Sequence, residues 1–376
     1  MKRQLMAFLV LVGLAFFISA PVYAEELSLE DRVANLEKTL GGVKFYGSLR
    51  MATFFEDSNI GPGSDDKSLR WDIQNNSRIG ATFTRGKLTG AYELGLDDDD
   101  NKVMTRKLYG IYDMGWGSLL IGQNNPILGN MFYSNQVYNN DNDLLGWGGV
   151  FETRLPQIKL TVKGLEVALI RDKSSSALNA DSGDVDALMP KLEVHYRIDQ
   201  PMFFMDVFGG LFAYTVDDIV LSSVNYGDET VSCWVAGFGG GLKLDPVFLK
   251  AQVYMAQNGK NFGLILQDAA GAKFDASGDV VNETNAGAHL VVGSKIGKYT
   301  VEAGFGYAYS QLDDPVASLD DDKNTCMSYY LNTTIPVYGS FFIVPEVGVL
   351  DYGDNSFGDD EKKDVTYIGA KWQIDF

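Results

Sequence analysis

The chain has 376 residues and a formal net charge of −19, with 50 acidic residues against 31 basic ones. This acidity argues against a nucleic-acid partner, because proteins that bind DNA or RNA neutralise phosphates with lysine and arginine. Aromatic residues make up 12% of the chain and glycine contributes 41 residues, whereas proline contributes only 10. That composition favours many tyrosine- and phenylalanine-rich strands with glycine in the strands and turns.

The first segment has the features of a secretory signal. Lys2 and Arg3 precede an apolar run from Leu5 to Ile18, and Val22-Tyr23-Ala24 follows the small-x-small cleavage rule. We therefore predict a signal peptide over residues 1–24 and export from the cytoplasm. The alternative is a membrane anchor, but the apolar run is shorter than the ~18 residues that a spanning helix needs.

Residues 25–42 predict a short helix. Its apolar residues are spaced four, three and four apart, as in an a/d seam: Leu29, Val33, Leu36 and Leu40. Because so short a helix is marginal alone in water, we expect it to have a partner, and a periplasmic coiled coil between protomers supplies one. The alternatives are a helix that lies on its own domain and a frayed tail.

From Val43 to Phe376 the pattern changes to strict alternation. At the C-terminus one face holds Ile368, Ala370, Trp372, Ile374 and Phe376, and the other holds Gly369, Lys371, Gln373 and Asp375. In 299–309 the aromatic and aliphatic residues alternate in the same way with polar or small ones. A lipid-facing exterior and a wet lumen explain both faces, so the pattern predicts an all-β, transmembrane antiparallel barrel over 43–376.

Connection lengths indicate the topology. Short connections are expected at 86–87, 115–117, 163–164, 199–201, 245–246, 297–298 and 336–339. Long ones are expected at 56–68, 97–102, 123–150, 171–187, 217–229, 257–281, 311–323 and 352–364. This alternation of short and long connections is typical of outer-membrane barrels, with short periplasmic turns and long outer loops. Counting segments predicts about sixteen strands, preceded by the short periplasmic helix.

Acidic runs fall in the expected long loops and in none of the short turns. The clearest is Asp97, Asp98, Asp99 and Asp100. Carboxylate clusters at the outer surface can bind a divalent cation and bridge to lipopolysaccharide phosphates. The alternative, a solvated and self-repelling loop, is favoured because no run shows the spaced ligands of a dedicated metal site. No cofactor is expected.

A catalytic function is not expected. The chain has two histidines, His195 and His289, and nothing near them in the sequence forms a set of nucleophile, base and orienting group. The two cysteines, Cys233 and Cys326, fall on different predicted strands. Export permits a disulfide between them, but two lone cysteines on separate strands rarely lie at bonding distance.

The charged residues of the early strands suggest a pore constriction. Four arginines lie on polar strand faces or at a strand start: Arg50, Arg70, Arg78 and Arg154. Asp141 and Asp143 lie on the early loop that is long enough to enter the lumen. Opposed charges across a narrow opening would create a transverse field that orients dipolar solutes and biases ion selectivity. The alternative is that each arginine pairs with a local carboxylate such as Asp72 and only stabilises the wall.

Several stretches resemble the general porins of Gram-negative bacteria. They are FYGSLR at 45–50, NNSRIG at 75–80, KLTGAYELGL at 87–96, TRKLYGIYDMGWGSLLIGQ at 105–123 and TRLPQIKLTVKGLEVALI at 153–170. Together they extend over nearly all of the barrel segment, although each motif is loose. The N-terminal heptad is more similar to that of phosphate- and solute-selective porins with a periplasmic coiled coil.

The resemblance implies a homotrimer of sixteen-stranded barrels whose third long loop folds inward. In this chain that loop is 124–149, and its carboxylates would face an arginine wall that includes Arg78 of the Ser-Arg-x-Gly motif and Arg154. The chain departs from the pattern at Gln123 and Ser48, which implies a weaker basic wall. The terminal Phe376 matches the residue that the barrel-assembly machinery reads.

Three functions remain open at this stage. The first is an outer-membrane channel for passive diffusion of ions and small hydrophilic solutes, with a mild cation preference from the loop acidity. The second is a channel selective for an oxyanion or a sugar, although no dense basic ladder and no clear aromatic track is evident. The third is a structural barrel or a barrel hydrolase, which the lack of a plug domain disfavours.

Overall fold

The computed structural model describes residues 42–59, 65–96, 103–141, 143–171, 182–187, 189–267, 269–314, 323–353 and 364–376. The predicted signal peptide, the heptad from Leu29 to Leu40 and the acidic run from Asp97 to Asp100 lie outside these residues. The segment from Lys44 to Phe376 forms one compact unit. No helix in the described residues is long and apolar enough to cross a membrane.

The elements follow in chain order. They are β1 (Val43–Asn59), β2 (Asp65–Ile73), β3 (Arg78–Arg85), β4 (Leu88–Leu96), β5 (Val103–Asp113), β6 (Ser118–Asn124), η1 (Leu128–Asn130), α3 (Tyr138–Asp141), β7 (Leu155–Val162), β8 (Leu165–Ile170), β9 (Ser182–Ala187), β10 (Lys191–Asp199), β11 (Phe203–Leu221), β12 (Val224–Asn225), β13 (Glu229–Leu244), β14 (Val247–Gln257), α4 (Gly259–Phe262), β15 (Lys273–Phe274), β16 (Val280–Val281), β17 (Glu283–Ile296), β18 (Tyr299–Leu312), β19 (Lys323–Tyr338), β20 (Phe341–Asp351) and β21 (Val365–Asp375).

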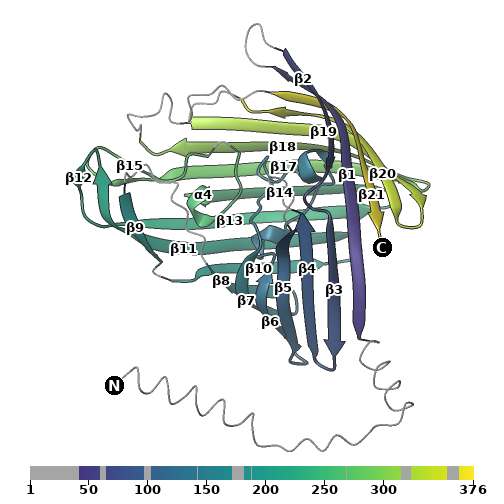
Figure 1. Ribbon diagram of the computed structural model, residues 1–376, viewed down its shortest axis with the longest axis horizontal. Helices are drawn as coiled ribbons and strands as arrows, with labels where there is room; N and C mark the ends of the chain where they lie inside the picture. The colour runs from purple at the N-terminus through teal and green to yellow at the C-terminus, as the bar shows by residue number, and fades with distance from the viewer. Residues whose placement is uncertain are drawn as a thin grey trace, which may run out of the picture. The chain divides into compact units, whose positions relative to one another are not determined.

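The described strands close into an antiparallel barrel of sixteen strands, which confirms the predicted fold class (Figure 1). Each barrel strand pairs with its neighbours along the chain, and β1 pairs with β21 to close the ring. β2 and β3 both pair with β1 and count as one interrupted strand, as do β9 and β10 against β11. Closure leaves no free edge that could pair with another chain.

The alternation that the sequence predicts holds on most strands. On β18 the side chains of Phe305 and Tyr307 face outward, whereas Glu302 is buried inside. On β21 Ile368 and Trp372 are exposed on the outer face, and Lys371 is buried inside. Because successive side chains of a strand point to opposite faces, each of these strands separates an apolar exterior from a polar interior.

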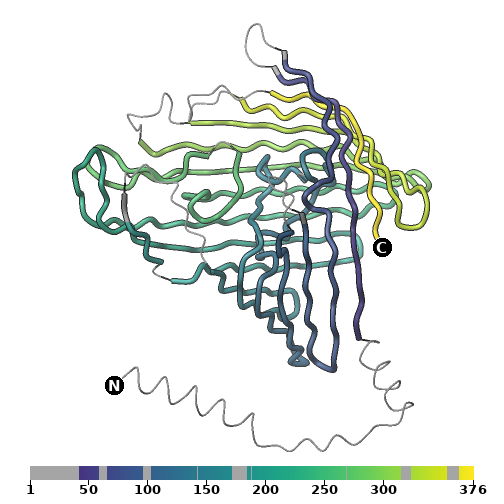
Figure 2. Tube along the Cα trace, in the orientation of Figure 1, coloured from purple at the N-terminus to yellow at the C-terminus, as the bar shows by residue number. Residues whose placement is uncertain are grey.

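The short turns fall where the sequence places them, with one exception. β19 continues to Tyr338, so its turn comes after the predicted start at Pro336. Several predicted long loops are also shorter than expected, because strands extend into them as hairpins. β11 runs on to Leu221 and pairs with β12, inside the predicted loop 217–229. Figure 2 traces these hairpins around the barrel. Beyond the membrane a hairpin needs no apolar face, so alternation does not mark its end.

Two connections pack inside the barrel. We name them the β6–β7 loop, residues 125–154, and the β14–β17 loop, residues 258–282. Their apolar residues form a core with the inner faces of β8, β11, β13 and β14, in which the largest loop side chains are Ile127, Leu128, Met131, Tyr133, Phe262, Leu264 and Phe274. The inner face of β11 is therefore apolar from Phe208 to Val216, whereas Asp206 near its start is polar.

Candidate functional site

The β6–β7 loop is held in place by carboxylates on the barrel wall. Glu346 of β20 accepts hydrogen bonds from the backbone N–H groups of Val137 and Tyr138, at 2.8 and 2.9 Å. Glu302 of β18 accepts one from the N–H of Asn135 at 2.6 Å. A carboxylate that accepts backbone N–H groups forms a charge-assisted hydrogen bond, about twice as strong as a neutral one. The wall thus satisfies loop donors that would otherwise be buried without partners.

Further wall residues hold the two ends of the same loop. Glu193 of β10 accepts the N–H of Leu128 at 3.0 Å, and Gln252 of β14 accepts the N–H of Val150 at 2.8 Å. At Gly306 of β18 the loop backbone approaches so closely that a Cβ would overlap a carbonyl oxygen of the loop. Only glycine permits that approach, so the sequence of β18 is adapted to a loop that crosses the lumen.

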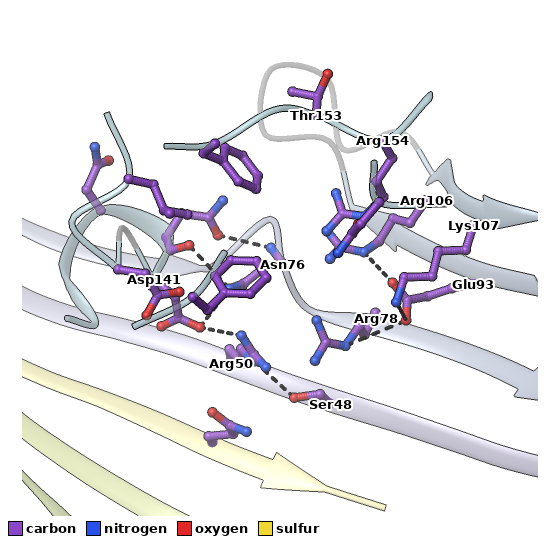
Figure 3. Close-up of a pocket in the computed structure, with 18 of the residues that line it drawn as sticks. Ser48, Arg50, Asn76, Arg78, Glu93, Arg106, Lys107, Asp141, Thr153 and Arg154 are labelled. Atoms are coloured by element: carbon purple, nitrogen blue, oxygen red, sulfur yellow. Dashed lines mark hydrogen bonds and ion pairs between the residues drawn. The ribbon is translucent and has the colours of Figure 1, made fainter. Parts of the chain in front are cut away.

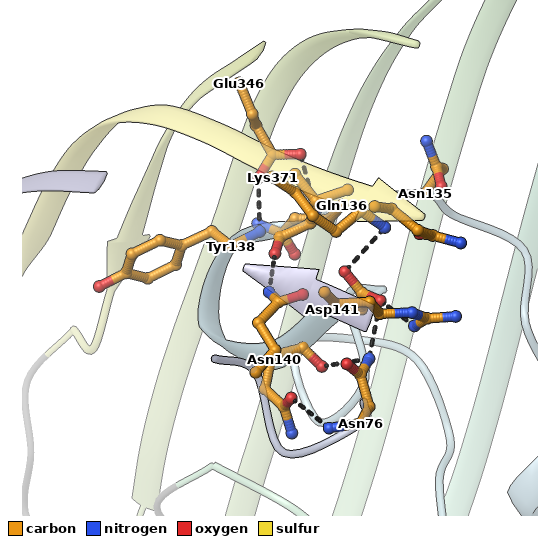
Figure 4. Close-up of polar contacts among 12 residues, drawn as sticks. Asn76, Asn135, Gln136, Tyr138, Asn140, Asp141, Glu346 and Lys371 are labelled. Atoms are coloured by element: carbon orange, nitrogen blue, oxygen red, sulfur yellow. Dashed lines mark hydrogen bonds and ion pairs between the residues drawn. The ribbon is translucent and has the colours of Figure 1, made fainter. Parts of the chain in front are cut away.

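A left-handed turn in this loop directs Asp141 toward the wall. Asn139, Asn140 and Asp141 have positive φ angles of 52°, 70° and 57°. Asparagine and aspartate tolerate this region best among residues with a Cβ, although three in a row store strain. The Asp141 carboxylate pairs with Arg50 of β1 and with Lys371 of β21, the latter at 3.0 Å (Figure 4). Asn76 also donates to it at 2.7 Å.

Arg50 is fixed by the interruption between β2 and β3. The Ser77 hydroxyl accepts the N–H of Arg50 at 2.9 Å and donates to its carbonyl at 3.1 Å. The Ser77 hydroxyl thus supplies the acceptor for the Arg50 N–H at the interruption, while the Arg50 carbonyl also accepts the N–H of Gln74 at 2.9 Å. The Arg50 guanidinium also donates to Ser48 at 3.1 Å. Arg50 and Asp141 are therefore joined at the point where the loop meets the first strand.

A cavity of about 910 Å³ lies beside this contact, between the β6–β7 loop and the wall (Figure 3). Its lining includes five cationic side chains and four carboxyl groups: Arg50, Arg78, Arg106, Lys107 and Arg154, and Glu93, Asp141, Asp143 and Asp375. The cavity brings together every predicted constriction residue except Arg70. That arginine pairs with Asp72 at 2.8 Å and donates to Asn139 at 3.2 Å, as the local alternative supposed.

One side of the cavity has an excess of positive charge. Glu93 of β4 pairs with Arg106 at 2.8 Å, and with Arg78 and Lys107 at 3.8 Å each. Figure 3 shows these four side chains together with Arg154, while Asp141 lies to the left beside Arg50. We name Arg78, Arg106, Lys107 and Arg154 the basic wall. Three of these four cations share one carboxylate, that of Glu93.

Sequence reasoning did not single out Lys107, although plain alternation places it inward, and it missed Arg106 because of a β-bulge. The register between β4 and β5 shifts after the pair Glu93–Lys107, which leaves Arg106 as the extra residue. A bulge puts two neighbouring side chains on the same face, whereas plain alternation would send Arg106 outward. Gly95 completes the arrangement, because a Cβ at this position would overlap the Arg106 side chain.

Arg154 differs from the other cations of the basic wall. Among the described residues it has no ion pair, and its buried Nε has no hydrogen-bond partner. Burying an unpaired polar nitrogen costs free energy unless a ligand or water completes it. Arg154 is therefore the side chain of the cavity best placed to bind an anion.

Asp143 contributes less negative charge than its sequence suggests. Removal from water and the adjacent Asp141 carboxylate raise the pKa of Asp143 well above its ordinary value. Since Asp141 is also paired with two cations, the loop presents little free negative charge to the cavity.

His195 and the cysteines take structural positions. His195 lies between two carboxylates, with Nδ1 at 3.0 Å from Glu166 and Nε2 at 2.8 Å from Asp206. No serine or cysteine hydroxyl or thiol takes part in these contacts, which join three neighbouring strands. Cys233 and Cys326 are both buried and both free thiols, so no disulfide joins them.

No family model matches the chain, and no curated protein matches it. The barrel is similar to the outer membrane channel DcaP of Acinetobacter baumannii, with a TM-score of 0.68 and 15% identity over 89% of this chain and 97% of that one. It is also similar to an anion-selective porin from Comamonas acidovorans, with a TM-score of 0.58 and 11% identity over 89% and 99%. The outer membrane protein OmpT of Vibrio cholerae matches with a TM-score of 0.56 and 14% identity over 89% and 97%. At these identities the likeness establishes the fold, which is the barrel of outer-membrane porins and channels.

Proposed function

We propose that this protein is an outer-membrane channel through which small hydrophilic solutes diffuse passively, with a constriction that favours anions. The apolar exterior suits the hydrocarbon core of a membrane, and the closed barrel satisfies every ladder hydrogen bond within it. The cavity between the β6–β7 loop and the basic wall is the narrow part of the path.

The observation that supports anion preference is the ratio of charges at the basic wall. Three of the four cations share Glu93, and the fourth, Arg154, has no carboxylate partner among the described residues. A ring of lysine and arginine biases a pore toward anions. Of the two selectivities expected from sequence, the geometry supports the oxyanion alternative over a mild cation preference, because Asp141 is already neutralised by Arg50 and Lys371.

The remaining expectations belong to the same proposal. Export by the 1–24 signal would deliver the chain to the outer membrane, where phospholipid and lipopolysaccharide surround the barrel. A homotrimer, joined in part by the helix of residues 25–42, remains the expected assembly. Phe376 remains the expected signal for the barrel-assembly machinery. Because the described site holds no arrangement of nucleophile and base, we propose no enzymatic activity for it.

Planar-bilayer recording of the refolded protein tests this proposal. We expect stepwise ohmic conductance in KCl, with a reversal potential of the sign that chloride permeation gives. Stepwise conductance with potassium preference would retain the channel and overturn the anion preference. Circular dichroism and the heat-dependent shift in gel migration verify that the protein is folded. Absence of conductance from folded protein would overturn the proposal that it is a channel.

A further inference from the structure

A second kind of surface lies in the same cavity as the basic wall. Phe132 and Phe151 of the β6–β7 loop and Ile265 of the β14–β17 loop line the cavity. Phe132 is 46% exposed and Ile265 is 39% exposed, although both belong to loops whose other large apolar residues are mostly buried. Exposing apolar area to water costs about 25 cal/mol per Å², so an apolar surface inside a wet pore calls for an explanation.

The three side chains line the same cavity and come from loop segments that lie side by side. The rings of Phe132 and Phe151 have centroids 6.1 Å apart and planes tilted by 49°. The backbone N–H of Ile265 donates to the carbonyl of Phe151 at 2.9 Å, which places the backbones of these two residues side by side. We name Phe132, Phe151 and Ile265 the apolar face. It belongs to the loops, whereas three of the four cations of the basic wall belong to barrel strands.

The apolar face is built on a rigid support. Directly beside it, Glu152 and Leu264 form an antiparallel bridge between the two loops. The buried Lys191 of β10 pairs with Glu152 and donates to the carbonyl of Phe262 at 3.2 Å. One wall lysine therefore joins both loops, and the apolar face is fixed in position rather than free to collapse.

The β14–β17 loop is also tied to the barrel at its far end. Glu283 of β17 accepts the N–H groups of Ala270 and Gly271, at 2.6 and 2.9 Å. Asn285 accepts the N–H of Gly259 at 2.8 Å. This loop is thus a second built element of the constriction, and its sequence carried no signal that distinguished it from an ordinary outer loop.

We infer that the cavity selects small organic anions that carry one carboxylate on an apolar body, such as aromatic or branched carboxylates, over compact anions of the same charge. The inference rests on the proposed function and adds to it the class of solute. The carboxylate would bind the basic wall, where Arg154 supplies an unpaired guanidinium. The apolar body would cover Phe132 and Ile265, which removes apolar area of both partners from water.

Benzoate and acetate are the probes, because they share the carboxylate and differ in the apolar body. Each is added to single open channels in KCl, and the concentration that halves the chloride current is recorded. We expect benzoate to act at a concentration about fivefold lower than acetate, as burial of part of one ring predicts. Equal concentrations for the two anions, in channels that conduct normally, would overturn the inference and leave the proposed function standing.

Variants separate the apolar face from the basic wall. Phe132→Asn/Ile265→Asn should abolish the difference between benzoate and acetate. Val224→Asn is the matched control, because Val224 is 49% exposed in the β12 hairpin and does not line the cavity. Ile265→Leu, which keeps the apolar surface, should retain the difference. An unchanged benzoate preference in the double variant would also overturn the inference.

Discussion

The two sides of the lumen share the same strand geometry but differ in the side chains that point inward. On the side of β3, β4 and β5 the inward side chains are charged and face a cavity. On the side of β11, β13 and β14 the inward side chains are apolar and pack against the two inward loops, with Phe208, Phe212 and Tyr214 as the largest on β11. An inward face is therefore charged where it borders the cavity and mainly apolar where protein fills the lumen, with single buried polar side chains such as Glu193 and Gln252 that hydrogen-bond the loops.

The largest expected effect tests the filled side. Lys191→Met leaves Glu152 buried without its cation, because the two side chains are 1% and 0% exposed and form an ion pair. We expect a loss of about 3–5 kcal/mol in the free energy of unfolding, measured by denaturant titration in detergent micelles. Lys243→Met is the control, since Lys243 pairs with Asp199 at the exposed rim and should change stability very little. Equal losses in the two variants would show that the loops are not held by the buried pair.

A smaller effect is expected at the loop anchor. Glu346→Ala removes the acceptor of two backbone N–H groups of the β6–β7 loop and should cost about 2–3 kcal/mol. The loosened loop should also produce rapid current flicker in single-channel records. Glu346→Gln keeps one acceptor oxygen and should show an intermediate effect. Single-channel records without flicker and an unchanged free energy of unfolding in Glu346→Ala would show that this carboxylate does not hold the loop in place.

The open side is tested by removing its single carboxylate. Glu93→Gln removes the carboxylate partner of Arg78, Arg106 and Lys107, so the ratio of chloride to potassium permeability should rise about two- to fivefold. Lys298→Gln also removes a charge but lies in an exposed short turn, and it should leave the ratio unchanged. A ratio that does not respond to Glu93→Gln would place the selectivity outside the basic wall.

The smallest effect concerns pH. Because the pKa of Asp143 is raised, its neutral form is the one that the fold favours, and the stability from this group is lost as pH rises through the folded pKa. As pH falls, Asp143 should take up its proton before ordinary aspartates, whose pKa is about 3.9. The loss of its negative charge should shift the reversal potential by a small step toward chloride preference. Asp143→Asn should remove this early step from a titration of the reversal potential. A step that persists in the variant would belong to another group.

The sequence predicted the barrel because alternation is a local signal that recurs on nearly every strand. It predicted Arg50, Arg78, Arg154 and Asp141 in one site, since their strand faces and their loop follow from the same alternation and connection lengths. It missed Arg106 because a bulge reverses the face of one residue, and no turn residue or glycine cluster marks that bulge.

It also missed the inward β14–β17 loop, although β11 carried a signal. The inner residues Phe208 and Phe212 and the outer residues Val207 and Leu211 are all apolar, so neither face of this strand suits water. A strand that is apolar on both faces needs lipid on one side and protein on the other. The signal shows that something covers the inner face, but not which loop does so, because that depends on contacts distant in sequence.

The reversal potential of the wild type and of Arg154→Gln, under a KCl gradient across a planar bilayer, tests the central claim most directly. The account predicts chloride preference in the wild type and a clear loss of it in the variant, because Arg154 is the cation of the basic wall without an ion pair among the described residues. Potassium preference in the wild type, or the same reversal potential in both proteins, would contradict the claim that the basic wall governs passage.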